Sequence, residues 1–141
     1  MYDLCRRLVE RGHKSIILTW TPSMPLFEII DGIMVHRIRM ARLFNFTRYP
    51  MIFYLSLHMM HLTRKYNIDI IHAHDYLPGL AAVLTGVFLN KPVVTTFHLP
   101  IQTTTFCLPS YLSPLLLIEK ILKKLFISWA VVICVSKFTY E

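Results

Sequence analysis

The sequence predicts an α/β fold in which helices cover both faces of a doubly wound parallel sheet. Three apolar runs of about five residues lack the polar alternation of half-exposed strands, namely Asp69–Ala73, Val93–Phe97 and Val131–Val135. Helical patterns separate these runs, as in a parallel sheet. The chain has 141 residues, 55% of them hydrophobic and 16% charged, which suits a single domain with a substantial core and excludes a disordered chain.

The chain begins with a pattern that predicts a short helix. Leu4, Leu8 and Val9 fall on one face of a helix that starts at about Tyr2. Gly12 follows, and a glycine can take the left-handed conformation that ends many helices. We therefore expect the first helix to stop just before this glycine.

Two strands are expected after this helix. Ser15–Thr19 is short, apolar and rich in β-branched residues, which favours a strand. Asp31 and Gly32 form a dipeptide typical of tight turns, and the segment Ile33–Ile38 behind it has strand character. The turn residues therefore mark the start of the second expected strand.

Three more helices are expected in the rest of the chain, one before the first buried strand and one between each pair of successive buried strands. Pro50 suits the first turn of a long helix that reaches about Tyr66. A basic helix is expected over about Leu115–Trp129. The core-facing positions of the long helix are Ile52, Leu55, Met59 and Leu62. Those of the helix between the first two buried strands are Leu80, Val83, Leu84, Val87 and Phe88.

Polar residues follow the three buried strands, at the positions where each strand is expected to end. Parallel sheets bind ligands at the carboxyl ends of their strands, where loops and helix N-termini meet. Three strands thus send polar side chains to one edge of the sheet. These residues are His72, His74, Asp75, His98, Ser136 and Lys137.

Metal and disulfide sites are not expected. His72 and His74 alternate onto one face of a strand, but no third ligand stands at a suitable spacing. Cys5, Cys107 and Cys134 are an odd number without the paired spacing of a disulfide framework or a zinc site. The cysteines favour a reducing, cytoplasmic compartment.

The positive charge predicts an anionic partner. Fifteen Lys and Arg residues stand against eight Asp and Glu, a net charge of +7. The longest uncharged segment, Pro92–Ile118, is interrupted by prolines and does not qualify as a membrane-spanning helix. The basic helix expected over Leu115–Trp129 suits either a membrane surface or an ordinary helix with a solvent-exposed charged face. The basic stretch Arg37–Arg48 suits either an acceptor phosphate or lipid headgroups, or a solvent-exposed linker. Nucleic acid is not expected, because the aromatic residues fall in apolar runs and no recognised binding motif is present.

Four segments carry a resemblance to a known family. In order, they are Glu10–Lys14, Asp69–Asp75, Pro92–His98 and Val132–Ser136, which read ERGHK, DIIHAHD, PVVTTFH and VICVS. Their order and spacing resemble the N-terminal half of family-4 glycosyltransferases of the GT-B type, over nearly the whole chain. The resemblance implies a Rossmann-like half of a GT-B fold. It also implies transfer of a sugar from a nucleotide-sugar donor to an acceptor, at the cytoplasmic face of the membrane.

The resemblance also implies roles for particular residues. His98 matches a histidine that faces the interdomain cleft near the reacting sugar, so it is the candidate catalytic residue. His74 and Asp75 match polar positions beside it, and Ser136 and Lys137 match a strand end and helix start that hold anionic groups in some relatives. These four are the candidate substrate-binding residues. The alternative for His98 is a loop-capping histidine bonded to the backbone.

The sequence departs from the family pattern at both ends. Family members begin with a further strand and a glycine-rich loop, and they carry a C-terminal donor-binding domain with two glutamates. Neither is found in residues 1–141. We therefore expect one acceptor-side domain of a hexosyl- or N-acetylhexosaminyl-type glycosyltransferase, a fragment that is inactive alone.

The partners follow from this expectation. The chain itself is expected to bind no cofactor, and the nucleotide-sugar donor is expected only for the complete enzyme, with the donor domain or a separate donor subunit. The acceptor is expected to be a sugar that is lipid-linked or otherwise close to the membrane. The alternative is a non-catalytic basic α/β domain that binds a membrane surface or another protein.

Overall fold

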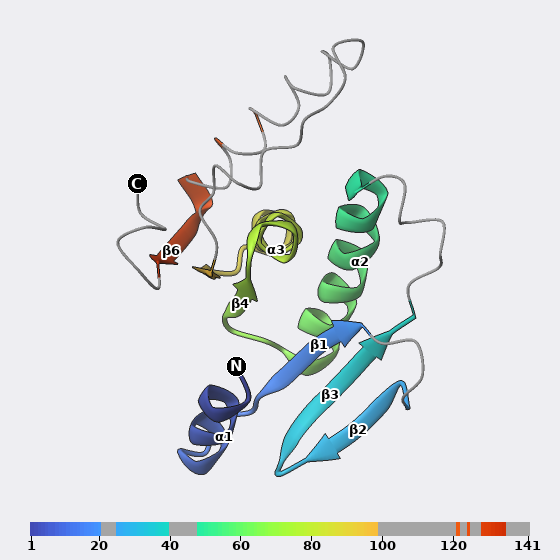
Figure 1. Cartoon of the computed structure of the whole chain (residues 1–141), viewed down its shortest axis with the longest axis vertical. Coiled ribbons are helices and arrows are strands. Elements are labelled where there is room, and N and C mark those ends of the chain that lie inside the picture. Colours follow the sequence, from blue (N-terminus) through green and yellow to red (C-terminus); the bar gives the residue numbers. More distant parts are fainter. Residues whose placement is uncertain (21–24, 40–47, 99–120, 122–123, 125–127, 135–141) are drawn as a thin grey trace. The chain divides into compact units, whose positions relative to one another are not determined.

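A computed structural model describes residues 1–20, 25–39, 48–98, 121, 124 and 128–134 (Figure 1). The chain divides into two compact units, Met1–Phe46 and Thr47–Glu141. Its elements, in chain order, are α1 (Tyr2–Glu10), β1 (Ile16–Trp20), β2 (Phe27–Ile30), β3 (Ile33–Ile38), α2 (Arg48–Tyr66), β4 (Ile71–His74), α3 (Tyr76–Leu89), β5 (Val93–Phe97) and β6 (Ala130–Cys134). The alternation of strands and helices confirms the predicted α/β class.

The first unit contains a three-stranded sheet with the order β1-β3-β2. β1 pairs with β3 in parallel, whereas β2 pairs with β3 antiparallel, so this sheet is mixed rather than wholly parallel. β2 was not predicted. It forms a hairpin with β3 through Asp31 and Gly32, whose φ angles of 49° and 78° are the positive values that a two-residue type I′ turn requires.

Helix α1 ends where the sequence predicts. Gly12 has a φ of 83°, and its backbone N–H donates to the carbonyl of Val9 at 2.9 Å. The Tyr2 hydroxyl at the start of the helix donates a hydrogen bond to the carboxylate of Asp31 in the hairpin turn. This bond raises the pKa of the Tyr2 hydroxyl. The helix is therefore tied to the sheet of its own unit by a polar contact at its first residue.

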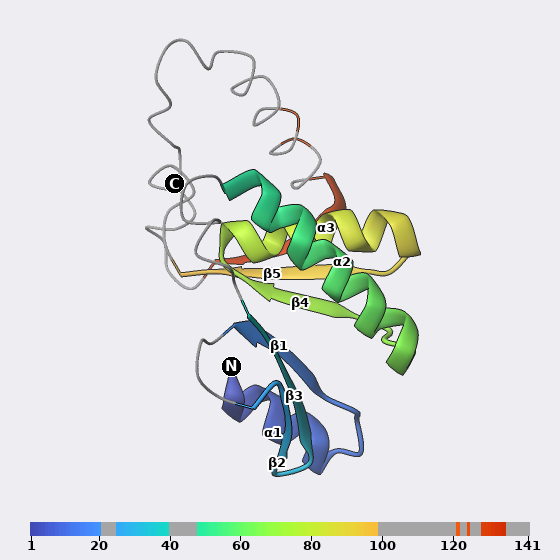
Figure 2. The ribbon, with the colours of Figure 1, turned by 90° about the vertical axis from the view of Figure 1, so that its right-hand side faces the viewer.

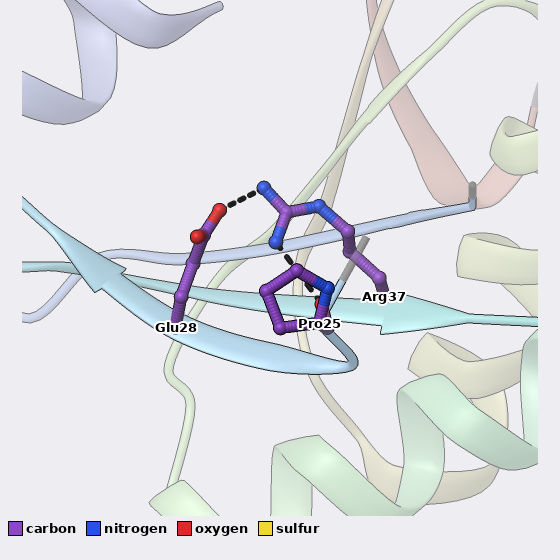
Figure 3. A network of polar contacts seen from close by, with 3 residues as sticks. All are labelled: Pro25, Glu28 and Arg37. Carbon is purple, nitrogen blue, oxygen red and sulfur yellow. Dashed lines mark hydrogen bonds and ion pairs between the residues drawn. The ribbon is translucent and has the colours of Figure 1, made fainter. Parts of the chain in front are cut away.

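An arginine holds the hairpin of the first unit together (Figure 3). The Arg37 guanidinium in β3 forms an ion pair with Glu28 in β2 and donates a hydrogen bond to the Pro25 carbonyl at 3.2 Å. The Arg37 side chain is only 10% exposed. Arg37 therefore fixes the hairpin, while Arg42 of the same basic stretch lies outside the described residues.

The second unit contains a parallel sheet with the order β4-β5-β6. Helices α2 and α3 lie on the same side of this sheet (Figure 2). β5 has the predicted bounds, and β6 begins and ends one residue earlier than predicted. Most of the basic helix predicted over residues 115–129 lies outside the described residues.

The core of the second unit lies between the sheet and these two helices. Strand residues at alternating positions are buried, namely Ile71, Ala73, Val93, Thr95 and Phe97. The helices contribute the buried residues Ile52, Leu55, Leu62, Leu80 and Val83. The two helices also share a polar contact, because the buried Ser56 hydroxyl lies 3.2 Å from the Ala81 carbonyl and donates to it. Burial of these five helix residues confirms part of the predicted helical pattern, whereas Met59 and Leu84 are only half-buried.

Two core predictions for α3 are wrong. Val87 is 40% exposed and Phe88 is 72% exposed, although the helical pattern placed both toward the core. The reason is the close approach of the helix to β5 at Gly86, where an added Cβ would lie 2.4 Å from Cγ2 of Val93. At this end of the helix, Gly86 therefore faces the sheet, while Val87 and Phe88 point away from the core.

Helix α2 starts two residues before Pro50, which is still within the first turn that tolerates proline. Beyond its end, Asn67 has a left-handed φ of 51°, and the Ile68 N–H donates to the Thr63 carbonyl at 3.0 Å. In the part of the chain that the structure describes, no helix combines the length and hydropathy needed to cross a bilayer.

Candidate functional site

The candidate site lies at the carboxyl ends of β4 and β5 in the second unit. His72 and His74 belong to β4, Asp75 is the first residue after it, and His98 directly follows β5. The Asp75 N–H donates to the Thr96 carbonyl at 2.9 Å, so the ends of the two strands are bonded to each other. Parallel pairing thus brings together His74, Asp75 and His98, three of the five residues for which the family resemblance predicts a catalytic or substrate-binding role.

The imidazoles of His74 and His98 meet edge to edge. Nδ1 of His74 lies 3.2 Å from Nε2 of His98, and the ring planes differ by only 14°. The ring centroids are 5.5 Å apart, and each nitrogen lies one ring radius from the centroid of its own ring. Because the centroid distance equals the nitrogen separation plus about two ring radii, both nitrogens lie on the line that joins the centroids. The rings are therefore nearly coplanar and share a hydrogen bond along the line between them.

Asp75 fixes the backbone on which His98 stands. Its Oδ1 accepts a hydrogen bond from the His98 N–H at 3.2 Å, and its side chain makes no capping bond to α3. Asp75 has a φ of 67° and a ψ of 175°, a conformation that costs a non-glycine residue about 1–3 kcal/mol. Backbone strain of this kind persists only where the surrounding structure holds the residue in place, and it clusters at functional sites.

His72 is held by a residue that the sequence analysis did not single out. Its Nε2 lies 2.8 Å from Oγ1 of Thr96, within hydrogen-bond distance. The His72 ring stacks on that of His74 with centroids 4.8 Å apart. Two threonines in an otherwise apolar strand are a weak signal for such a partner, and the parallel register is needed to place Thr96 beside β4.

The site favours neutral imidazoles. Burial lowers the pKa of the His72 imidazole. Burial also lowers the pKa of the His74 imidazole, and the nearby rings of His72 and His98 lower it further, against a smaller opposing effect of the Asp75 carboxylate. At neutral pH, His72 and His74 are therefore uncharged and each offers one donor and one acceptor nitrogen.

These lowered pKa values predict that acid destabilises the fold. His72 and His74 take up protons in the unfolded chain near pH 6.5, but only at lower pH in the folded chain. The stability that they contribute above pH 6.5 is therefore lost as the pH falls below that value. Because both rings are partly hydrated, we expect less than about 1 kcal/mol from each.

Urea unfolding at pH 7.5 and pH 5.5 measures this loss. The unfolding free energy of the His74→Gln variant should fall less over this interval than that of the unchanged chain. His13→Gln is the control, because His13 is exposed and distant in sequence from the site. An equal fall in the His74 variant and the unchanged chain would contradict the assignment.

The geometry is suited to binding hydroxyl groups. A neutral imidazole can donate to or accept from a hydroxyl, and a carboxylate beside it can accept a second one. Among the described residues the ring of His98 bonds to His74, while the backbone of His98 is held by Asp75. No group of three or more His, Cys, Asp or Glu in the described ranges could hold a metal ion.

The last two predicted site residues, Ser136 and Lys137, lie outside the described residues.

The family of the chain is established by comparison with known proteins. No curated protein matches the chain significantly. The sequence pattern of Glycosyltransferase Family 4, however, matches residues 1–141. This match covers the α/β units and the strand ends described above. The chain therefore belongs to glycosyltransferase family 4, whose activity is glycosyl transfer.

Proposed function

We propose that the chain is the acceptor-side domain of a glycosyltransferase that moves a hexosyl or N-acetylhexosaminyl group from a nucleotide sugar to a lipid-linked or other membrane-proximal acceptor. His98 contacts the acceptor hydroxyl and serves as its proton acceptor. His74 and Asp75 complete the polar surface around it. The observation that carries this proposal is the convergence of two imidazoles and a carboxylate at the ends of β4 and β5.

Preorganisation supports this role for His98. Its backbone is bonded to Asp75 and its ring to His74, so two separate hydrogen bonds limit the motion of the side chain. A group held in position in advance lowers the entropic cost of reaching the transition state. The strained Asp75 backbone fits the same interpretation. In this strained conformation the Asp75 carboxylate accepts the hydrogen bond from the His98 N–H.

The proposal includes a donor, an acceptor and two residues that lie outside the described part of the chain. The nucleotide-sugar donor is bound by a donor domain or a separate donor subunit, and Ser136 and Lys137 receive an anionic group of the substrate. The net charge of +7 supports work at an anionic membrane surface, on its cytoplasmic face. The acceptor hydroxyl is then presented close to the headgroups.

The His98→Ala variant tests the proposal. The full chain is mixed with membranes from the cell of origin and a panel of radiolabelled nucleotide sugars, and label in the lipid fraction is counted. Loss of the proton acceptor should lower incorporation by about 100-fold. The His13→Ala variant, which changes an exposed histidine of the first unit, should incorporate label at the unchanged rate. Unchanged incorporation by His98→Ala would remove His98 from the site.

A second candidate function is non-catalytic binding to a membrane surface or to a protein. The observation that favours it is an exposed stripe on α2, formed by Phe53, Leu57, His61 and Arg64. Phe53 and Leu57 are each 65% exposed. This candidate predicts sedimentation with vesicles of anionic lipid but no incorporation of label from any nucleotide sugar, even when the membranes supply their own donor-binding proteins.

A further inference from the structure

We propose that His74 is a positioning residue that selects the tautomer of His98. In this arrangement Nε2–H of His98 donates to Nδ1 of His74, and Nδ1 of His98 keeps its lone pair. The inference rests on the proposed function, because it is the proton-accepting role of His98 that needs this lone pair. It assigns His74 a role different from direct contact with substrate.

The edge-to-edge geometry couples the tautomers of the two rings. A neutral imidazole carries one N–H, so either Nδ1 of His74 or Nε2 of His98 donates the shared bond. If Nε2 of His98 donates, both rings carry their proton on Nε2. If Nδ1 of His74 donates, both rings carry their proton on Nδ1. The direction of one bond at 3.2 Å therefore decides which nitrogen of His98 is basic.

The surroundings of His74 favour its neutral form, which is the form in which Nδ1 can accept. A protonated His74 would have hydrogen on both nitrogens and could not accept. Burial and the stacked ring of His72 disfavour that state and lower the pKa of His74. His72 is itself bonded to Thr96, which fixes the stack from the other side. The site thus stabilises the neutral form that either direction of the bond requires, and the proton-accepting role proposed for His98 requires the direction in which His74 accepts.

The other nitrogen of His98 is left for a ligand. The His98 side chain is exposed, and among the described residues its Nδ1 has no hydrogen-bond partner. A hydroxyl that approaches the strand ends can therefore donate to this nitrogen directly. Within the described ranges, the pair accordingly has one nitrogen of His98 bonded to His74 and the other without a protein partner.

Long-range proton–nitrogen NMR of the ¹⁵N-labelled full chain at pH 7.5 tests the inference. We expect His98 to be protonated at Nε2 and unprotonated at Nδ1, with scalar coupling across the hydrogen bond to Nδ1 of His74. Protonation at Nδ1 of His98, or the absence of coupling in the unchanged chain, would overturn it. This measurement needs neither a donor nor an acceptor, so its result does not depend on the proposed function.

Two variants separate positioning from substrate contact. His74→Phe keeps a ring but removes the acceptor, and we expect a shift of the His98 ring nitrogens toward a tautomer mixture, with about tenfold less incorporation of label. In His74→Asn, Oδ1 can accept in place of Nδ1, so the His98 nitrogens and the incorporation should stay near those of the unchanged chain.

His61→Phe, on the exposed stripe of α2, is the matched control and should leave the His98 nitrogens unchanged. Unaltered His98 nitrogens in His74→Phe would overturn the inference, even if incorporation fell, because His74 would then act on the substrate itself. Absence of incorporation in every variant would instead count against the proposed function, while the NMR result would still decide the inference.

Discussion

The Phe97→Ala variant is expected to lose a large part of the unfolding free energy of the second unit. Phe97 is the last residue of β5 and only 1% exposed, so its ring is surrounded by the core. Truncating a buried phenylalanine to alanine costs about 3–5 kcal/mol, from lost burial and the cavity that remains. Whole domains are stable by only about 5–15 kcal/mol. The variant should therefore be close to unfolding at room temperature.

Urea unfolding followed by circular dichroism measures this effect. Phe88→Ala is the matched control, because the same side chain is removed from a position that is 72% exposed, and we expect a change below about 0.5 kcal/mol. Phe97→Leu fills most of the cavity and should recover much of the loss. Equal midpoints for the two alanine variants would contradict the burial of Phe97.

Phe97 also connects the core to the candidate site. The residue after it is His98, so the packing of the Phe97 side chain fixes the position from which the His98 side chain extends. In the Phe97→Leu variant, which keeps the fold, a displaced His98 would weaken the bonds to His74 and Asp75. The NMR signals of the His98 ring would report such a displacement directly.

The strands of the second unit could be predicted because their signal is local. Val93–Phe97 is an uninterrupted apolar and β-branched run, and the structure gives β5 those bounds. β2 could not be predicted in the same way. Its four residues, Phe27–Ile30, include the charged Glu28, whose pairing with Arg37 across the hairpin is a tertiary contact. Only the Asp31-Gly32 turn gave a local sign of this hairpin.

The edge of the sheet that holds the site could also be predicted, because parallel strands end on the same side. The contacts within the site could not. The hydrogen bond between His74 and His98 depends on the register that sets His74 opposite Thr96, and chain order does not contain that register. The positive φ of Asp75 is likewise imposed by its bonds to β5, although aspartate tolerates it better than most residues.

The close approach of α3 to β5 leads to the second large prediction, that Gly86→Ala destabilises the second unit. An alanine in a helix gains about 1 kcal/mol over glycine from propensity alone. Here, however, the new Cβ would lie 2.4 Å from Cγ2 of Val93 and 2.8 Å from the carbonyl oxygen of Lys91. Overpacking of a core costs about 1–3 kcal/mol and more when backbone must move. We therefore expect a net loss of about 2 kcal/mol.

The Val93→Ala change identifies which contact is responsible. The double variant Gly86→Ala with Val93→Ala lacks Cγ2, so its loss of unfolding free energy should be smaller than the sum of the losses in the two single variants by about 1 kcal/mol. The part of the loss that remains comes from the Lys91 carbonyl, which belongs to the backbone and is not removed by a side-chain substitution. The hydrogen bond from the Lys91 N–H to the Gly86 carbonyl, at 2.9 Å, holds this carbonyl close to the helix. If urea unfolding instead shows Gly86→Ala to be more stable than the unchanged chain, helix propensity prevails and α3 does not approach β5 this closely.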